Sequence, residues 1–78
     1  MNKIEVLFFG QLKEISKQDH LILENIQDTD SLQNELIKLY PTLNSISYRV
    51  AVNKSLILEN TPLFNESKVA LLPPFSGG

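Results

Sequence analysis

Asp30-Ser31-Leu32-Gln33-Asn34-Glu35-Leu36-Ile37-Lys38-Leu39-Tyr40 stands at the centre of the sequence and has the pattern of an amphipathic helix. Its apolar residues recur at helical spacing, at Leu32, Leu36, Leu39 and Tyr40, so they share one face. Asp30 is predicted to be the N-cap, because Gln33 follows three residues later as a capping box requires. Pro41 ends the helix, since it has no N–H to donate and disfavours α-helical backbone in the residue before it.

Strand-like segments lie on both sides of this helix. Before it we expect two strands with a short helix between them: Lys3–Phe9, Asp19–Glu24, and Gln11–Lys17 as the helix. After it we expect three further strands: Tyr48–Asn53, Leu56–Leu58 and Lys68–Leu72. Two consecutive prolines end the last strand, because neither can donate to a strand ladder.

This order of elements predicts an α+β fold of the β-grasp type, a mixed sheet with one main helix packed across it. The first and last strands are the most apolar, so we expect them to be neighbours in the centre of the sheet. A length of 78 residues leaves no room for a second core. We therefore expect one domain, residues 1–72, followed by a flexible, extended C-terminal tail, residues 73–78.

The composition excludes several classes of protein. There is no cysteine, which rules out disulfides, iron–sulfur clusters, thiol nucleophiles and cysteine-based zinc sites. The net charge is −2 with no basic cluster, so we expect no nucleic-acid partner. No apolar run is long enough for a membrane helix, and the first residues lack the pattern of a secretory signal. We expect a cytoplasmic protein with no bound metal and no membrane partner.

The tail, Pro73-Pro74-Phe75-Ser76-Gly77-Gly78, is the most informative segment for function. Paired prolines favour an extended exit from the domain, and the two glycines give the thinnest backbone available to enter a narrow channel. As the last residue, Gly78 would carry an ionised carboxylate, which is a poor acyl electrophile until it is activated, for example as an acyl-adenylate made from ATP. The sequence holds no phosphate loop or catalytic triad, so we expect this chain to be the substrate of an activating enzyme.

Three stretches carry a family resemblance: residues 6–12 (Val-Leu-Phe-Phe-Gly-Gln-Leu), Ala51-Val52-Asn53, and residues 69–78. Together they resemble the MoaD/ThiS sulfur carriers, and the Pro-Pro-x-Ser-Gly-Gly ending is most similar to the small subunit of molybdopterin synthase. The family usually has a Gly-Asp-Glu turn before the last strand, where this sequence has Asn65-Glu66-Ser67-Lys68. Because asparagine tolerates left-handed backbone, we expect the turn to be retained.

The resemblance implies a ubiquitin-like β-grasp fold and a carrier role for the terminus. Gly78 would be adenylated by an E1-like enzyme at the expense of ATP, converted to a thiocarboxylate (1-thioglycine) by a sulfur donor, and inserted into the large synthase subunit. Two sulfur transfers to cyclic pyranopterin monophosphate would build the dithiolene of molybdopterin. The partners would be that large subunit, in a heterotetramer, and the adenylating enzyme, and the chain itself would be a non-catalytic, sulfur-donating subunit with no bound cofactor.

Two alternatives remain for the tail. In the first, the chain is a sulfur carrier for the thiazole pathway and not the synthase subunit. In the second, it is a ubiquitin-like modifier that forms isopeptide bonds with lysines. A third alternative is a β-grasp interaction domain with an inert terminus, for which deleting the two glycines would change nothing.

A docking surface is predicted from the strand faces that point away from the core. Leu7 and Phe9 on the first strand align with Ala70 and Leu72 on the last, and Leu56 and Phe75 extend the set. We expect an exposed apolar patch that binds both partners in turn, with loops over these residues as the alternative. The lysines and Arg49 are interpreted mainly as solvated surface, with Lys68 and Arg49 at the rim of the patch as the alternative, and His20 is given no role.

Overall fold

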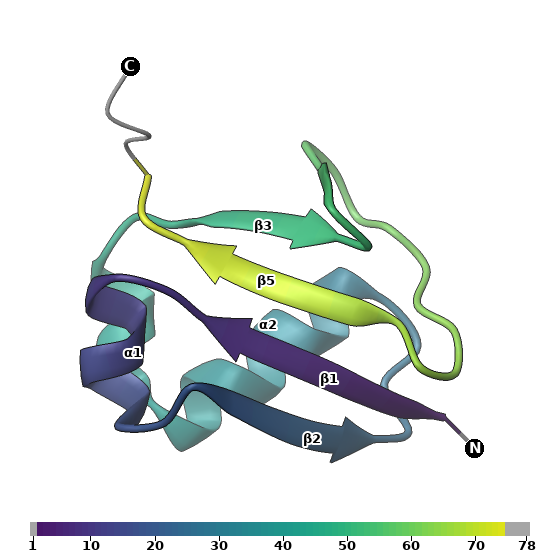
Figure 1. Cartoon of the computed structure of the whole chain (residues 1–78), viewed down its shortest axis with the longest axis horizontal. Helices are drawn as coiled ribbons and strands as arrows, with labels where there is room; N and C mark the ends of the chain where they lie inside the picture. The colour runs from purple at the N-terminus through teal and green to yellow at the C-terminus, as the bar shows by residue number, and fades with distance from the viewer. Residues whose placement is uncertain (1, 75–78) are drawn as a thin grey trace.

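The computed structural model describes residues 2–74 of the chain. Five strands form one sheet in the order β2-β1-β5-β3-β4, and one long helix crosses one of its faces (Figure 1). The strands are β1 (Lys3–Phe8), β2 (His20–Glu24), β3 (Arg49–Val52), β4 (Ser55–Leu56) and β5 (Lys68–Leu72). The helices are α1 (Gln11–Ser16), α2 (Thr29–Leu39) and the 3-10 helix η1 (Pro41–Ser45). The predicted α+β, β-grasp fold is confirmed, while the predicted flexible end of the tail, residues 75–78, lies outside the described residues.

The first and last strands are neighbours at the centre of the sheet, as predicted. β1 and β5 run parallel, with Val6 opposite Val69, and the other pairs of neighbouring strands are antiparallel. Both central strands alternate buried core residues with residues of the opposite face. Because β1 and β5 are parallel, their C-terminal ends lie at the same end of the sheet.

The core lies between the sheet and α2. Ile4, Val6 and Phe8 of β1 and Val69 and Leu71 of β5 point toward the helix and are almost completely buried. Leu32 and Leu36 of α2, one turn apart, pack against them. The ring of Phe8 meets Tyr40 edge to face, with 5.9 Å between centroids, just after the last turn of the helix.

Helix α2 begins two residues earlier than the sequence predicted. Its N-cap is Asp28, whose carboxylate accepts a hydrogen bond of 2.8 Å from the Ser31 N–H. Asp30 lies in the first turn, where its own N–H donates to Oδ1 of Asn60 at 2.9 Å. The two aspartates have similar local patterns, and the distant Asn60 side chain stabilises the earlier start.

Two predictions about loops were also wrong in detail. The expected strand Leu56–Leu58 is limited to the two-residue β4, and Leu58 is 94% exposed. In the turn before β5 the left-handed residue is Glu66, with φ of 68°, not Asn65. Oδ1 of Asn65 instead accepts a hydrogen bond from the Lys3 N–H at 3.0 Å and so fastens the turn to β1.

Candidate functional site

On the face of the sheet opposite α2, residues 2–74 place no helix (Figure 1), and this face carries an apolar hollow. Six apolar residues line it, five on strands β1, β3, β4 and β5 and one directly after β1: Leu7, Ala51, Leu56, Ala70 and Leu72, and Phe9. The hollow has a volume of about 500 Å³, and Asn53, Lys54 and Lys68 complete its rim. Phe9 is 46% and Leu56 is 53% exposed, so these side chains line an open surface and do not lie under a loop. An apolar surface of this kind is typical of a protein interaction site.

The apolar hollow contains four of the five residues predicted for partner binding. Leu7, Phe9, Leu56 and Leu72 lie together there, and Phe75 lies outside the described residues. Of the two residues considered for the rim, Lys68 lies there and Arg49 does not line the hollow. The role of the lining residues as partner contacts stays a prediction. Lys54 at the rim was missed, because a lysine in a turn gives no signal in the sequence that distinguishes it from any solvated lysine.

Gly10 fixes the place where the chain leaves the sheet toward its C-terminus. The residue has φ of 58°, a conformation that glycine adopts without strain. A Cβ atom at this position would lie only 2.6 Å from Cγ of Pro73, the first residue after β5. Gly10 therefore allows both the turn after β1 and the close approach of Pro73. A glycine that directly follows a strand was the only hint of this contact in the sequence.

Arg49 makes a second contact with the same segment. Its Nε donates a hydrogen bond of 3.1 Å to the carbonyl oxygen of Pro74. Arg49 is opposite Leu72 in the β3–β5 register, so the guanidinium lies beside the last residue of β5. We call Pro73 and Pro74 the tail root. Arg49 bonds to the tail root and Gly10 leaves room for it, at the end of the sheet where β1 and β5 both finish (Figure 1).

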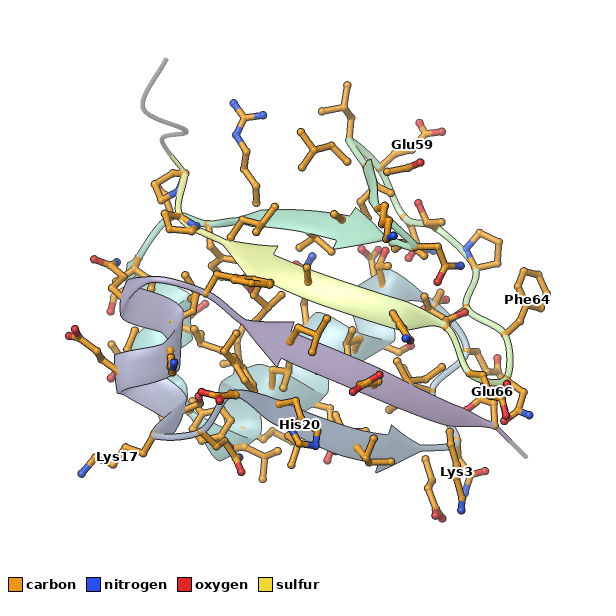
Figure 2. All side chains as sticks on the ribbon, viewed as in Figure 1. Lys3, Lys17, His20, Glu59, Phe64 and Glu66 are labelled. Atoms are coloured by element: carbon orange, nitrogen blue, oxygen red, sulfur yellow. The ribbon has the colours of Figure 1, made fainter. Side chains whose placement is uncertain are left out.

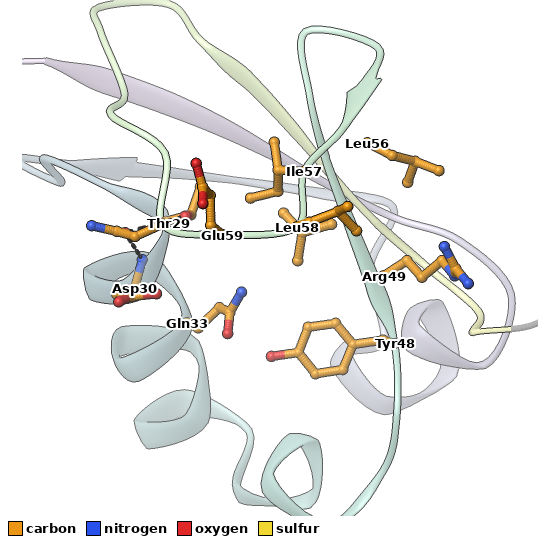
Figure 3. Close-up of a pocket in the computed structure, with 11 residues that line it drawn as sticks. Thr29, Asp30, Gln33, Tyr48, Arg49, Leu56, Ile57, Leu58 and Glu59 are labelled. Carbon is orange, nitrogen blue, oxygen red and sulfur yellow. Dashed lines mark hydrogen bonds between the residues drawn. The ribbon is translucent and has the colours of Figure 1, made fainter.

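A second groove lies between the start of α2 and the segment 56–60 (Figure 3). It has a volume of about 430 Å³ and a mixed lining that includes Gln33, Tyr48 and Glu59. Burial raises the pKa of the Tyr48 phenol, so this side chain is neutral at physiological pH. Asn60 bonds to both Thr29 and Asp30 across one end of the groove, which is a structural role. We favour the apolar hollow as the functional site, because it is more apolar and lies beside the tail root.

Two kinds of feature are absent from residues 2–74. No group of three His, Asp or Glu side chains there is placed to hold a metal ion. No helix in this part of the chain is long and apolar enough to cross a membrane.

Comparisons with known proteins identify the family of the chain. Residues 6–78 match the ThiS family. Subunit 1 of the molybdopterin-converting factor of Helicobacter pylori, solved as a complex with subunit 2, is 30% identical, with a TM-score of 0.72 and coverage of 97% of this chain and 99% of that chain. The small archaeal modifier protein 1 of Methanosarcina acetivorans is 28% identical, with a TM-score of 0.79 and coverage of 100% and 98%.

A third solved structure supports the fold alone. The putative molybdopterin-converting factor subunit 1 of Pyrococcus furiosus has a TM-score of 0.88 at 17% identity and covers 96% of this chain and 100% of that chain. The match to the ThiS family spans nearly the whole sequence and includes every strand except the start of β1. The chain therefore belongs to the ThiS family, the family of the MoaD/ThiS-type sulfur carriers.

Proposed function

We propose that this chain is the small, sulfur-carrying subunit of a molybdopterin synthase and that Gly78 is the residue that carries the sulfur. The observation that supports this most strongly is the position of the apolar hollow. The hollow extends to the end of the sheet where Pro73 and Pro74 leave β5. A partner bound to the hollow is therefore next to the start of the tail. The sequence Pro-Pro-Phe-Ser-Gly-Gly then leads to the reactive carboxylate.

The proposed loading reaction has two steps. In the first, a carboxylate oxygen of Gly78 attacks the α-phosphorus of ATP, which forms the glycyl adenylate and releases pyrophosphate. In the second, a hydrosulfide-level sulfur attacks the glycyl carbonyl carbon, and the C–O bond to AMP breaks. The products are the thiocarboxylate, AMP and a proton. Glycine suits this chemistry, because it has no Cβ to obstruct attack on the carbonyl carbon.

The apolar hollow is proposed to bind both the activating enzyme and the large synthase subunit. Leu7, Phe9, Leu56 and Leu72 supply the apolar centre of this contact, and Lys54 and Lys68 supply a charged rim. Phe75 of the tail is proposed as a further contact with the partner. One surface cannot hold two partners at once, so the carrier would leave the activating enzyme before it delivers sulfur to cyclic pyranopterin monophosphate. The H. pylori relative, solved as a complex of subunits 1 and 2, supports a large-subunit partner.

Intact mass spectrometry tests the proposal. The protein with a native C-terminus is incubated with cell extract, ATP and a sulfide source. We expect a mass gain equal to the replacement of one oxygen by sulfur, located at Gly78 by fragmentation. A variant that lacks Gly78 should show no gain and should not support molybdenum-cofactor synthesis in cells without their own small subunit. Synthesis supported by that variant would overturn the proposal.

Variants of the apolar hollow test the docking step separately. Leu72→Asp should load and bind the large subunit poorly, because it puts a charge at the centre of an apolar contact. Phe64→Asp is the matched control, since Phe64 is 69% exposed and lies outside the apolar hollow (Figure 2). Equal binding by both variants would place the contact elsewhere.

A second function, protein modification, is supported by the likeness to the M. acetivorans small archaeal modifier protein 1. In that case an amine of a target lysine, in place of sulfur, displaces AMP and forms an isopeptide bond with Gly78. Covalent conjugates of higher mass in the same extract, with no thiocarboxylate, would favour the modifier. The paired prolines of the tail root are the sequence feature that favours the synthase subunit over the thiazole-pathway carrier.

A further inference from the structure

Within residues 2–74, the outer strand β2 leaves one row of backbone groups unpaired. On its inner side, Phe8 N–H donates to the carbonyl of Asp19 at 2.9 Å and Asn25 N–H donates to that of Asn2 at 3.0 Å. Peptide groups alternate in direction along a strand, so odd-numbered residues of this segment face β1. The N–H and C=O groups that point outward, away from the sheet, are those of His20, Ile22 and Glu24.

The two edges of the sheet differ in how they are protected. The other edge strand, β4, has two residues and offers little backbone for pairing. β2 has five residues without a proline or lysine, and three consecutive apolar residues occupy its centre. Natural proteins shorten or charge the edges that they keep unpaired. β2 has the features of an edge that is paired.

The sequence of β2 is complementary to itself in one antiparallel register. The register that pairs all three outward residues has Ile22 opposite Ile22 of a second copy, which places His20 opposite Glu24 at both ends. Ile22 is 49% exposed, and His20 and Glu24 are both exposed on the same face. Figure 2 shows His20 on this outermost strand. Each imidazole would then lie against a carboxylate of the other copy.

No ion pair within the described residues engages the side chains of His20 and Glu24, which would pair between the two copies. In residues 2–74 the one ion pair joins Lys13 and Asp19, so neither His20 nor Glu24 is engaged in one there. On the opposite face, the half-buried Leu21 would meet Leu23 of the second copy and extend the apolar contact.

We propose that two copies of this chain associate through β2 and form a continuous ten-stranded sheet around a two-fold axis at Ile22. The apolar hollow and the tail root lie on strands away from this edge and stay free in both copies. The axis is perpendicular to the sheet, so both hollows face the same side and the two tail roots point in opposite directions. The proposal goes beyond the sulfur-carrier function and does not depend on it.

Sedimentation equilibrium and backbone amide exchange test this dimer over protein concentrations up to about 1 mM. The expected result is a monomer–dimer equilibrium, with exchange of the outward Ile22 amide slowed as concentration rises. Ile22→Lys should abolish association, since two lysines would meet on the axis. Phe64→Lys, an exposed apolar residue far from β2 in the sequence, is the matched control and should dimerise normally.

A charge exchange tests the register itself. Glu24→Lys should weaken dimerisation roughly tenfold, because two attractive cross-strand pairs are lost and a lysine faces each His20. Adding His20→Glu to that variant restores opposite charges and should restore most of the affinity. Circular dichroism checks that each variant is folded. A monomer at every concentration, or a dimer that is indifferent to both Ile22→Lys and Glu24→Lys, would overturn the proposal.

Discussion

The two faces of the sheet are built from the same strands but differ in what covers them. Leu71 and Leu72 are neighbours in β5, yet Leu71 is completely buried under α2, whereas Leu72 lines the apolar hollow. The same alternation holds in β1, where Phe8 is buried and Leu7 faces the hollow. One face is filled by the chain itself, and on the other no residue of the described part of the chain covers the apolar hollow. The difference indicates that the covered face maintains the fold and the uncovered face is available to partners.

The strongest test of this comparison is truncation of each neighbour in β5. Leu71→Ala should lower the free energy of unfolding by about 3 kcal/mol, because it leaves a cavity in the core. Leu72→Ala should cost less than about 1 kcal/mol and should act instead on partner binding. Urea denaturation of both variants gives the comparison directly. Equal decreases in the free energy of unfolding for the two variants would mean that both faces of the sheet contribute equally to stability, contrary to this comparison.

A substitution at Gly10 tests how much the close approach of Pro73 to the turn after β1 contributes to stability. Gly10→Ala should destabilise the protein by about 1–2 kcal/mol, since an L-residue is strained at φ of 58° and its Cβ meets Pro73. Combining it with Pro73→Ala should recover part of the loss, because the ring atoms that clash are removed. A double-mutant cycle with no coupling would show that the turn alone accounts for the effect.

Asp28 tests how much the N-terminal cap of α2, the helix that covers the core face of the sheet, contributes to stability. Hydrogen bonds from the side chain and the backbone N–H of Ser31 hold the pKa of the Asp28 carboxyl below its ordinary value of 3.8. A lowered pKa in the folded state stabilises the protein above the ordinary value, and this contribution is lost as the pH falls through the folded-state pKa. Asp28→Ala should therefore lower the melting temperature by a few degrees at pH 7 and by much less at about pH 2.

Asp30→Ala is the matched control for the cap. It should change the melting temperature little, because the structure places Asp30 after the cap and its side chain is exposed. A larger effect at Asp30 than at Asp28 would contradict the assigned start of α2.

The smallest expected effect lies at the end of the sheet away from the tail root. Glu66→Gly should stabilise the protein by about 0.5 kcal/mol, because glycine accepts φ of 68° and its greater freedom in the unfolded chain offsets part of that gain. Asn65→Gly should have the opposite sign, since it removes the hydrogen bond to Lys3. Thermal melts of both variants, with large-subunit binding unchanged, would separate stability of the turn from function of the apolar hollow.

Local pattern was sufficient to predict most of the fold. Alternation in β1 and β5 predicted their central position and the two sets of side chains, and Pro41 marked the end of α2. Errors occurred where a distant side chain decides between similar local options. Asn60 supports the start of α2 at Asp28, and Asn65 fixes the turn in which Glu66 is left-handed.

The candidate site was predictable in part, for the same reason. Leu7, Phe9 and Leu72 follow from strand alternation, so the sequence predicted their shared face. The contacts of Gly10 with Pro73 and of Arg49 with Pro74 join segments far apart in the chain. No local pattern specifies such contacts, so only the folded structure identifies them.

The parallel pairing of β1 with β5 has a consequence for how the protein is made. The centre of the sheet joins segments from near the two ends of the sequence, so it cannot form on a nascent chain before β5 has left the ribosome. Until then the apolar residues of β1 lack their main neighbour, and the hollow does not exist, because β5 forms part of its wall. A partner that recognises the hollow would therefore ignore chains that are truncated before β5. Under the proposed function, sulfur loading would thus be restricted to chains that have been synthesised through β5.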